Sequence, residues 1–143
     1  MRRKNLIYTI LILFSSLCLT GYLFAAEEKE EETKKNHKTV VIHEHEGVTP
    51  QILRIEPGTT VIWVNLTLVE AEVLFLDRKV IDAADCPVYF FIGDDGTYES
   101  HEMCAGCATS LCFQEEGRFD YIVKEARNSY GDEKEYQGTI LVK

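Results

Sequence analysis

The sequence predicts an all-β sandwich of seven to eight strands, and three observations lead to that prediction. Residues 39–143 consist of short apolar runs separated by turn residues, a pattern typical of strands joined by tight turns. The turn signals fall between these runs: Pro57-Gly58, Asp94-Asp95-Gly96, Glu116-Gly117 and Tyr130-Gly131. No stretch of this region keeps an apolar period of about 3.6 residues long enough for a substantial helix. So many short strands in one small domain are typical of two sheets packed face to face.

The alternation of side chains indicates how the strands are oriented. Val40 and Ile42 alternate with polar residues and should face the core. Residues 61–64 are apolar on both faces, which predicts a central strand, and residues 119, 121 and 123 share one apolar face. The expected strands are 39–45, 51–55, 60–65, 71–76, 88–92, 110–113, 118–124 and 138–142.

The N-terminus predicts export. Arg2, Arg3 and Lys4 precede an uncharged apolar run from Leu6 to Ala26, the arrangement that the export machinery recognises. Residues 1–26 are therefore a signal peptide or a membrane anchor: the run is long enough to span a bilayer, and cleavage after Ala26 is the alternative. Cys18 follows a leucine, which argues against a lipoprotein site and for a membrane-buried thiol. We expect a periplasmic or otherwise extracytoplasmic protein, secreted or anchored.

The charge of the exported part restricts its partners. Residues 27–38 are rich in Glu and Lys and predict a flexible linker, followed by one domain over residues 39–143. The chain beyond Ala26 has 12 basic and 24 acidic residues, a net charge of −12. No basic patch is available for nucleic acid, whereas an exported redox or envelope protein with a basic surface is a compatible partner.

Four sequence blocks resemble the plastocyanin-like cupredoxin family. They are an Ile-rich strand at 51–55, Pro57-Gly58-x-x-Val61-x-Trp63-x-Asn65, then Gly117-x-Phe119-x-Tyr121, and finally Gly138-x-Ile140-x-Val142. The resemblance covers residues 39–143, with a departure between Asp77 and Ser110. It implies a Greek-key sandwich that holds one copper ion and shuttles electrons in an exported compartment. Within this frame Asn65 is a turn residue, a role favoured over its Asn-x-Thr glycosylation pattern.

The four positions at which the family keeps its copper ligands carry other residues here. The first histidine corresponds to Ala71, the cysteine to Val123, the second histidine to Ala126 and the axial methionine to Tyr136. A blue-copper site needs a thiolate and two imidazoles, and Ala, Val and Ala supply no donor atom. The sequence therefore predicts a cupredoxin-like sandwich without the usual copper site.

A cysteine-rich segment lies within the departure from the family pattern. His101, Cys104, Cys107 and Cys112 have the spacing His-x2-Cys-x2-Cys-x4-Cys, with Cys86 upstream. These donors could bind zinc or copper(I). Disulfides are the alternative in an oxidising compartment, with Cys86–Cys112 and Cys104–Cys107 as the preferred pairs. Thiol exchange through Cys104 and Cys107 is a third hypothesis.

Two smaller clusters contain further histidines and carboxylates. His43 and His45 are two residues apart on an expected strand, so they would share one face and could chelate a metal ion or sense pH. Asp94, Asp95 and Glu99 lack the ligand spacing of a calcium loop and predict a hairpin turn instead.

No catalytic constellation is evident, which indicates a protein that is not an enzyme. Three functions remain open. They are a metal-binding or electron-transfer accessory role with copper or zinc at the Cys/His segment, thiol–disulfide redox chemistry, and a disulfide-stabilised interaction domain without metal.

Overall fold

A computed structural model describes residues 36–126 and 133–143. The predicted signal or anchor segment and most of the predicted linker lie outside these residues. Within the described part, no helix is long and apolar enough to span a membrane.

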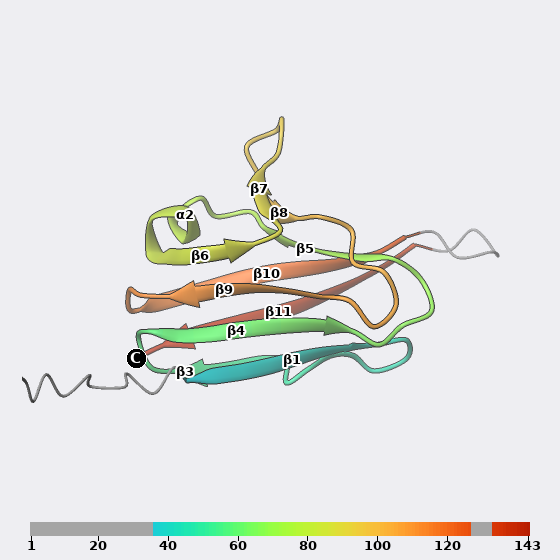
Figure 1. Cartoon of the computed structure of the whole chain (residues 1–143), viewed down its shortest axis with the longest axis horizontal. Helices are drawn as coiled ribbons and strands as arrows, with labels where there is room; N and C mark the ends of the chain where they lie inside the picture. Colours follow the sequence, from blue (N-terminus) through green and yellow to red (C-terminus); the bar gives the residue numbers. More distant parts are fainter. Residues whose placement is uncertain (1–35, 127–132) are drawn as a thin grey trace, which may run out of the picture. The chain divides into compact units, whose positions relative to one another are not determined.

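The described residues form two mixed β-sheets packed as a sandwich, which confirms the predicted fold class (Figure 1). One sheet has the order β2-β1-β4-β9-β6 and the other β3-β11-β10-β5-β8-β7. The strands of the first are β1 (His37–His43), β2 (Gly47–Thr49), β4 (Thr59–Asn65), β6 (Ala84–Val88) and β9 (Ala108–Phe113). Those of the second are β3 (Ile52–Ile55), β5 (Ala71–Phe75), β7 (Phe90–Ile92), β8 (Tyr98–Ser100), β10 (Gly117–Glu125) and β11 (Lys134–Val142).

The core lies between the sheets and contains the side chains that the alternation assigned to it. Val40, Ile42 and Val61 are fully buried. Trp63 packs edge-on against Tyr121 at 5.5 Å between ring centroids and against Phe75 at 6.0 Å. As predicted, β4 is a central strand, since it pairs with β1 on one side and with β9 on the other.

The structure departs from the predicted strands mainly between residues 77 and 100. The expected strand 88–92 is the junction of two strands, β6 and β7, which belong to different sheets. A short helix, α2 (Lys79–Ala83), precedes β6, and its buried residues Val80 and Ala83 fix it to the sandwich. With the three-residue strands β2 and β8 added, the described residues contain eleven strands rather than seven or eight. Strands this short leave little period-two signal in a sequence.

Candidate functional site

The four positions of the family's copper ligands meet at one end of the six-stranded sheet. Ala71 on β5 pairs with Glu125 on β10, and Val123 pairs with Val73 on β5 and Tyr136 on β11. Beside them, the Ala126 amide donates to the Glu70 carbonyl at 2.7 Å. The frame read from the sequence thus brings these positions together in space.

A regular strand ladder continues through this end of the sheet. The pairing of β10 with β11 begins at Gly117↔Val142 and ends at Glu125↔Lys134 without a break in register. Opposite charges face each other across its last two rungs, at Lys124↔Glu135 and Glu125↔Lys134, which favours the pairing. The methyl and isopropyl groups of Ala71 and Val123 are buried beneath it.

Tyr136, at the axial methionine position, holds the turn between β1 and β2 instead of facing a metal. Its hydroxyl donates to the Glu44 carbonyl at 3.2 Å, and Lys134 Nζ donates to the same oxygen at 3.0 Å. Its ring packs on Gly47, where an added Cβ would lie only 2.6 Å from Cδ1 of the tyrosine. The residues of this end therefore do not fit a copper ion: three lack donor atoms, and the fourth is engaged elsewhere.

A buried carboxylate lies among these positions. Glu125 is 5% exposed, and its Oε1 has no hydrogen-bond partner among the described residues. Burial raises the pKa of Glu125, and nearby Glu44 raises it further, whereas Lys134, a hydrogen bond with Tyr136 and His45 lower it. The sequence already contained its signal, because Glu125 continues the inward alternation of residues 119, 121 and 123.

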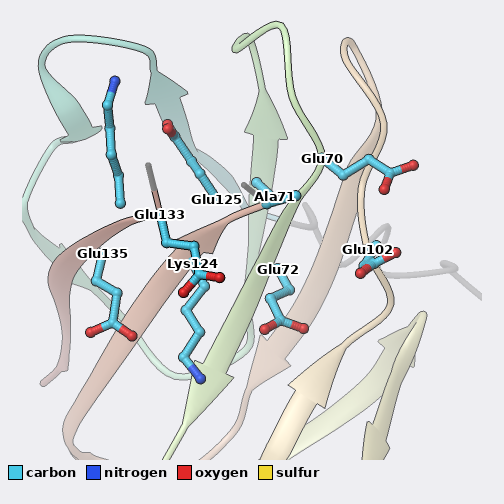
Figure 2. A pocket seen from close by; sticks show the side chains of 10 residues that line it. Glu70, Ala71, Glu72, Glu102, Lys124, Glu125, Glu133 and Glu135 are labelled. Carbon is cyan, nitrogen blue, oxygen red and sulfur yellow. The ribbon is translucent and has the colours of Figure 1, made fainter. Parts of the chain in front are cut away.

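A small, strongly charged pocket of about 200 Å³ adjoins this end (Figure 2). Two lysines accompany the carboxylates there. Burial raises the pKa of Glu72, and Glu99 and Glu102 add to this effect, whereas Lys124 opposes it. The lining residues are Glu70, Ala71, Glu72, Glu102, Lys124, Glu125, Ala126, Glu133, Lys134 and Glu135.

On the other side of Ala71 lies a loop closed by a disulfide. Met103 pairs with Ala71 through two backbone hydrogen bonds, of 2.7 and 3.0 Å. Cys104 and Cys107 follow and form a disulfide, with their Cα atoms 5.1 Å apart. Cys104 is exposed, whereas Cys107 is half-buried and packs against the core. The predicted local pair is therefore present.

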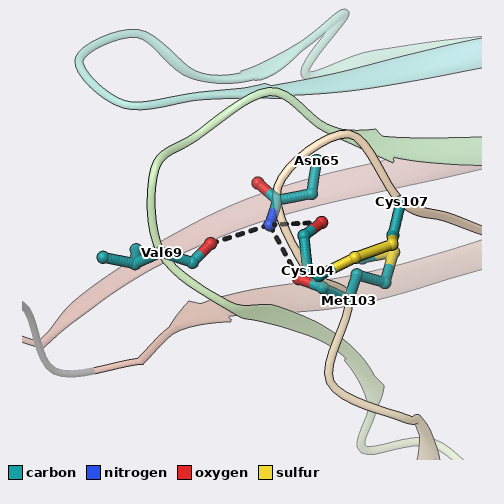
Figure 3. The surroundings of a disulfide bond; sticks show 5 residues. All are labelled: Asn65, Val69, Met103, Cys104 and Cys107. Carbon is teal, nitrogen blue, oxygen red and sulfur yellow. Dashed lines mark hydrogen bonds between the residues drawn. A yellow bond between two sulfur atoms is a disulfide. The ribbon is translucent and has the colours of Figure 1, made fainter.

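Asn65, at the end of β4, holds this loop in place (Figure 3). Its buried side-chain Nδ2 donates to the carbonyls of Val69 and Met103, both at 2.8 Å, and of Cys104 at 3.3 Å. Its backbone N–H donates to the Cys107 carbonyl at 2.9 Å, and its carbonyl accepts from Gly106 at 2.7 Å. The structural role favoured for Asn65 is thus supported, and it extends to the disulfide loop.

The structure does not assemble the predicted metal set His101, Cys104, Cys107 and Cys112. Cys107 precedes β9 and Cys112 lies near its other end, roughly 17 Å away at about 3.4 Å per residue. The His101 ring contacts Phe91, with centroids 4.7 Å apart. Within residues 36–126 and 133–143, no three His, Cys, Asp or Glu side chains are grouped closely enough to hold a metal ion.

The predicted Cys86–Cys112 disulfide is not formed in the structure, and both thiols are free. The strands β6 and β9 are neighbours, but Cys112 pairs with Asp85 rather than with Cys86. The register then shifts between Asp85 and Val88, and Cys86 has a φ of 51°. This irregularity takes Cys86 out of regular cross-strand alignment, and no residue pattern in the sequence indicates it.

The two smaller clusters have different outcomes. β1 ends at His43, and His45 lies in the exposed turn that follows, so the two histidines do not share a strand face. The hairpin predicted at Asp94–Gly96 is present between β7 and β8. There Asp95 Oδ1 accepts from the Thr97 amide at 2.9 Å, and Gly96 has a φ of 87°.

Neither family models nor the sequences of curated proteins match this chain, but solved structures do. A copper(I) amicyanin with a methionine-to-alanine substitution gives a TM-score of 0.51 at 20% identity, over 78% of this chain and 87% of that chain. A copper(I) amicyanin with a methionine-to-glutamine substitution gives a TM-score of 0.51 at 19% identity, over 76% of this chain and 83% of that chain. A reduced amicyanin with a tryptophan-to-tyrosine substitution gives a TM-score of 0.51 at 19% identity, over 78% of this chain and 87% of that chain. The domain therefore has the cupredoxin fold, and identities this low carry nothing beyond the fold.

Proposed function

We propose that this domain is an exported thiol–disulfide redox protein that works through Cys104 and Cys107 on a cupredoxin scaffold without the usual copper site. The observation that carries the proposal is the exposure of Cys104 in a short disulfide loop, next to the position of the first copper ligand. Export rests on the positively charged start and apolar run of residues 1–26.

The chemistry needs a dithiol protein as co-reactant. One thiolate of the partner attacks Sγ of Cys104, a mixed disulfide forms, and Cys107 leaves as a thiolate. The partner's second thiolate then attacks the partner's first sulfur in the mixed disulfide, and Cys104 leaves as a thiolate. The partner loses two electrons and becomes a disulfide, and this chain gains two electrons and takes up two protons. Cys104 is the expected target because it is exposed and Cys107 is half-buried.

The local framework favours reversible chemistry. The hydrogen bonds from Asn65 to the loop join backbone groups of the loop and involve neither sulfur atom. They would keep the two thiols close to each other after reduction, so the disulfide could close again without a search through many loop conformations.

The length of the closed loop also argues against a mainly structural role. By the chain-entropy relation, a loop of about four residues stabilises a fold by about 2 kcal/mol, whereas a Cys86–Cys112 bond, with about 27 residues, would contribute about 3.5 kcal/mol. The pair that is oxidised in the structure is therefore the one that contributes less to stability.

A redox titration tests the proposal. The full chain carrying Cys18→Ser, kept in mild detergent, is equilibrated with dithiothreitol buffers of graded potential, and its free thiols are alkylated and counted by mass. We expect two free thiols when oxidised, four when reduced, reversible conversion and a retained fold. The matched control, Cys86→Ser with Cys112→Ser, should titrate at the same potential. Reduction should lower Tm by roughly 8 to 16 °C, because the disulfide contributes about 2 kcal/mol to the free energy of unfolding.

A disulfide that resists reduction until the fold is lost would overturn this function. It would favour the second candidate, an interaction domain stabilised by the same bond. The packing of Cys107 against the core is the observation that favours this second candidate.

A further inference from the structure

An exposed group of three rings lies close to the disulfide loop. Tyr89 is 66% exposed and Phe91 39%, and His101 is exposed beside them. The His101 ring centroid is 4.7 Å from that of Phe91 and 6.4 Å from that of Tyr89. The backbone N–H of His101 donates to the Tyr89 carbonyl at 2.7 Å. We call Tyr89, Phe91 and His101 the aromatic patch.

Packing of the domain does not explain this exposure. Phe90, between the two exposed rings, already fixes the segment, because it stacks on Tyr98 at 5.4 Å and contacts Trp63 at 5.9 Å. Tyr89 has a φ of 62°, a conformation that costs a residue other than glycine about 1–3 kcal/mol. The strand β7 is also the edge of its sheet, and Figure 1 shows the β7–β8 hairpin standing out from the sandwich.

Carboxylates border the aromatic patch. Glu99 on β8 is the cross-strand partner of Phe91 on one side and of Leu74 on the other. Glu102 follows His101 directly, and both Glu99 and Glu102 lie near enough to Glu72 to raise its pKa, after the larger effect of burial. We call Glu72, Glu99 and Glu102 the acidic rim.

The aromatic patch and the disulfide lie within reach of one interface. His101 and Cys104 are three residues apart, so their Cα atoms are separated by at most about 11 Å. The pairing of Met103 with Ala71 fixes the chain between them to the end of β5. A standard interface covers about 800 Å² on each partner, which is wide enough to include both features.

We propose that the aromatic patch and the acidic rim form the docking surface for the dithiol partner, and that the partner presents its dithiol on an apolar surface bordered by lysine and arginine. This inference rests on the proposed function. Exposed rings supply the buried contacts that dominate protein interfaces, and carboxylates around them select a basic partner and accelerate its approach. A second copy of this chain would bring the same carboxylates against one another.

Two synthetic peptides test the docking surface. Both contain Cys-x-x-Cys within the same apolar residues, and they differ only in their flanks, which are Lys and Arg in one and Glu in the other. In redox-inactive forms with serine in place of cysteine, they are titrated into the full chain labelled with 15N. We expect the basic peptide to bind, with shifts at Tyr89, Phe91 and His101, and its affinity to fall about tenfold between roughly 0.05 and 0.5 M salt.

Variants separate the surface from the chemistry. Glu99→Gln with Glu102→Gln should weaken binding of the basic peptide about fivefold, and Tyr89→Asn with Phe91→Ser should remove it; asparagine tolerates a positive φ. The control Glu115→Gln with Glu116→Gln, exposed beyond the far end of β9, should leave binding unchanged.

The outcomes distinguish this inference from the proposed function. Equal binding of the two peptides, shifts confined to another face, or a dimer of this chain that protects the patch would overturn the docking surface. Slow reduction of the native disulfide by dithiothreitol, a small neutral reagent, would overturn the redox function regardless of how the peptides bind. With both correct, the thiol form of the basic peptide should reduce the disulfide about tenfold faster than the acidic one, and Glu99→Gln with Glu102→Gln should lower that difference to about twofold.

Discussion

The strand pair β10–β11 and the loop Met103–Cys107 flank the same strand, β5, but they hold their residues in different ways. Ala71 shows the contrast, because it pairs with Glu125 on one side and with Met103 on the other. Towards β10, backbone pairing continues in register to the end of the strands. Towards the loop, pairing is limited to an isolated bridge, and the side chain of Asn65 replaces a strand partner.

The two sides consequently differ in the chemistry that they can support. The ladder buries hydrocarbon at Ala71 and Val123 and leaves no donor atom for a soft metal. The loop places a disulfide at the surface, and the hydrogen bonds from Asn65 that hold the loop join backbone atoms rather than the sulfurs. Redox chemistry at this end of the fold would therefore have to take place in the loop.

Asn65 holds the loop Met103–Cys107 beside β5 through its side-chain hydrogen bonds. Loss of this side chain should have the largest effect on stability. Alanine would remove one of the two donors to each of the carbonyls of Val69 and Met103. It would also remove the Asn65 oxygen that accepts from the Thr67 amide at 2.9 Å and from its hydroxyl at 2.8 Å. We expect Asn65→Ala to lower the free energy of unfolding by about 3 kcal/mol. Urea unfolding measures it, and dithiothreitol should reduce the loosened loop faster.

A surface amide provides the comparison for this variant. Gln114→Ala, exposed in the turn after β9, should change the free energy of unfolding by less than about 0.5 kcal/mol. If Asn65→Ala costs less than about 1 kcal/mol, the loop is held by its disulfide and not by Asn65.

The regular side was largely predictable from the sequence, because alternation and turn residues record buried faces directly. Residues 118–124 and 60–65 appear as strands nearly as expected. The start of β11 differs from the prediction, because the strand begins at Lys134, four residues before the predicted strand, in a polar stretch. That stretch pairs because its charges face opposite charges on β10. The sequence of either strand alone does not reveal which residues will face each other.

The irregular side was less predictable, because its geometry depends on which strands are neighbours. The short spacing of Cys104 and Cys107 favours them as a local pair among the three possible pairings, and that pair is present. The state of Cys86 depends on a register shift between β6 and β9, and the separation of Cys107 from Cys112 depends on the length of β9. Residue types reveal neither the register shift nor the length of β9. The predicted metal ligands are therefore close together in the sequence but far apart in the structure.

Glu125 offers a smaller test of how tightly the ladder is closed. Its pKa is raised above the ordinary value of 4.5, so the folded chain keeps the proton at pH values at which the unfolded chain has released it. Stability should therefore fall as the pH rises above about 4.5 through the pKa of the folded state. We expect Glu125→Gln to remove this decline, with stability equal to that of the native chain near pH 4 and greater than that of the native chain at pH 8.

Urea unfolding at pH 4, 6 and 8 measures the effect of Glu125. Lys134, Glu44, Tyr136 and His45 are the charged or titratable groups that act on this carboxyl, and the variant leaves them in place. Glu116→Gln, exposed in the turn between β9 and β10, is the matched control and should follow the native profile. A variant that is less stable than the native chain at pH 8 would mean that the bond to Tyr136 outweighs the cost of burial.

The smallest expected effect is that of copper on the native chain. Ala71, Val123 and Ala126 supply no donor atoms, and Tyr136 holds the β1–β2 turn through Glu44. We expect that copper(II) added to the oxidised full chain will not produce the intense visible absorption of a copper–thiolate bond, with a copper-loaded amicyanin as the positive control. Cys86 and Cys112 are the free thiols within the described residues, so Cys86→Ser with Cys112→Ser should leave the spectrum unchanged. An intense band that persists in this double variant would come from Cys18 or from Cys104 and Cys107. If it is also present with Cys18→Ser, the disulfide loop opens and binds copper, which would contradict the prediction.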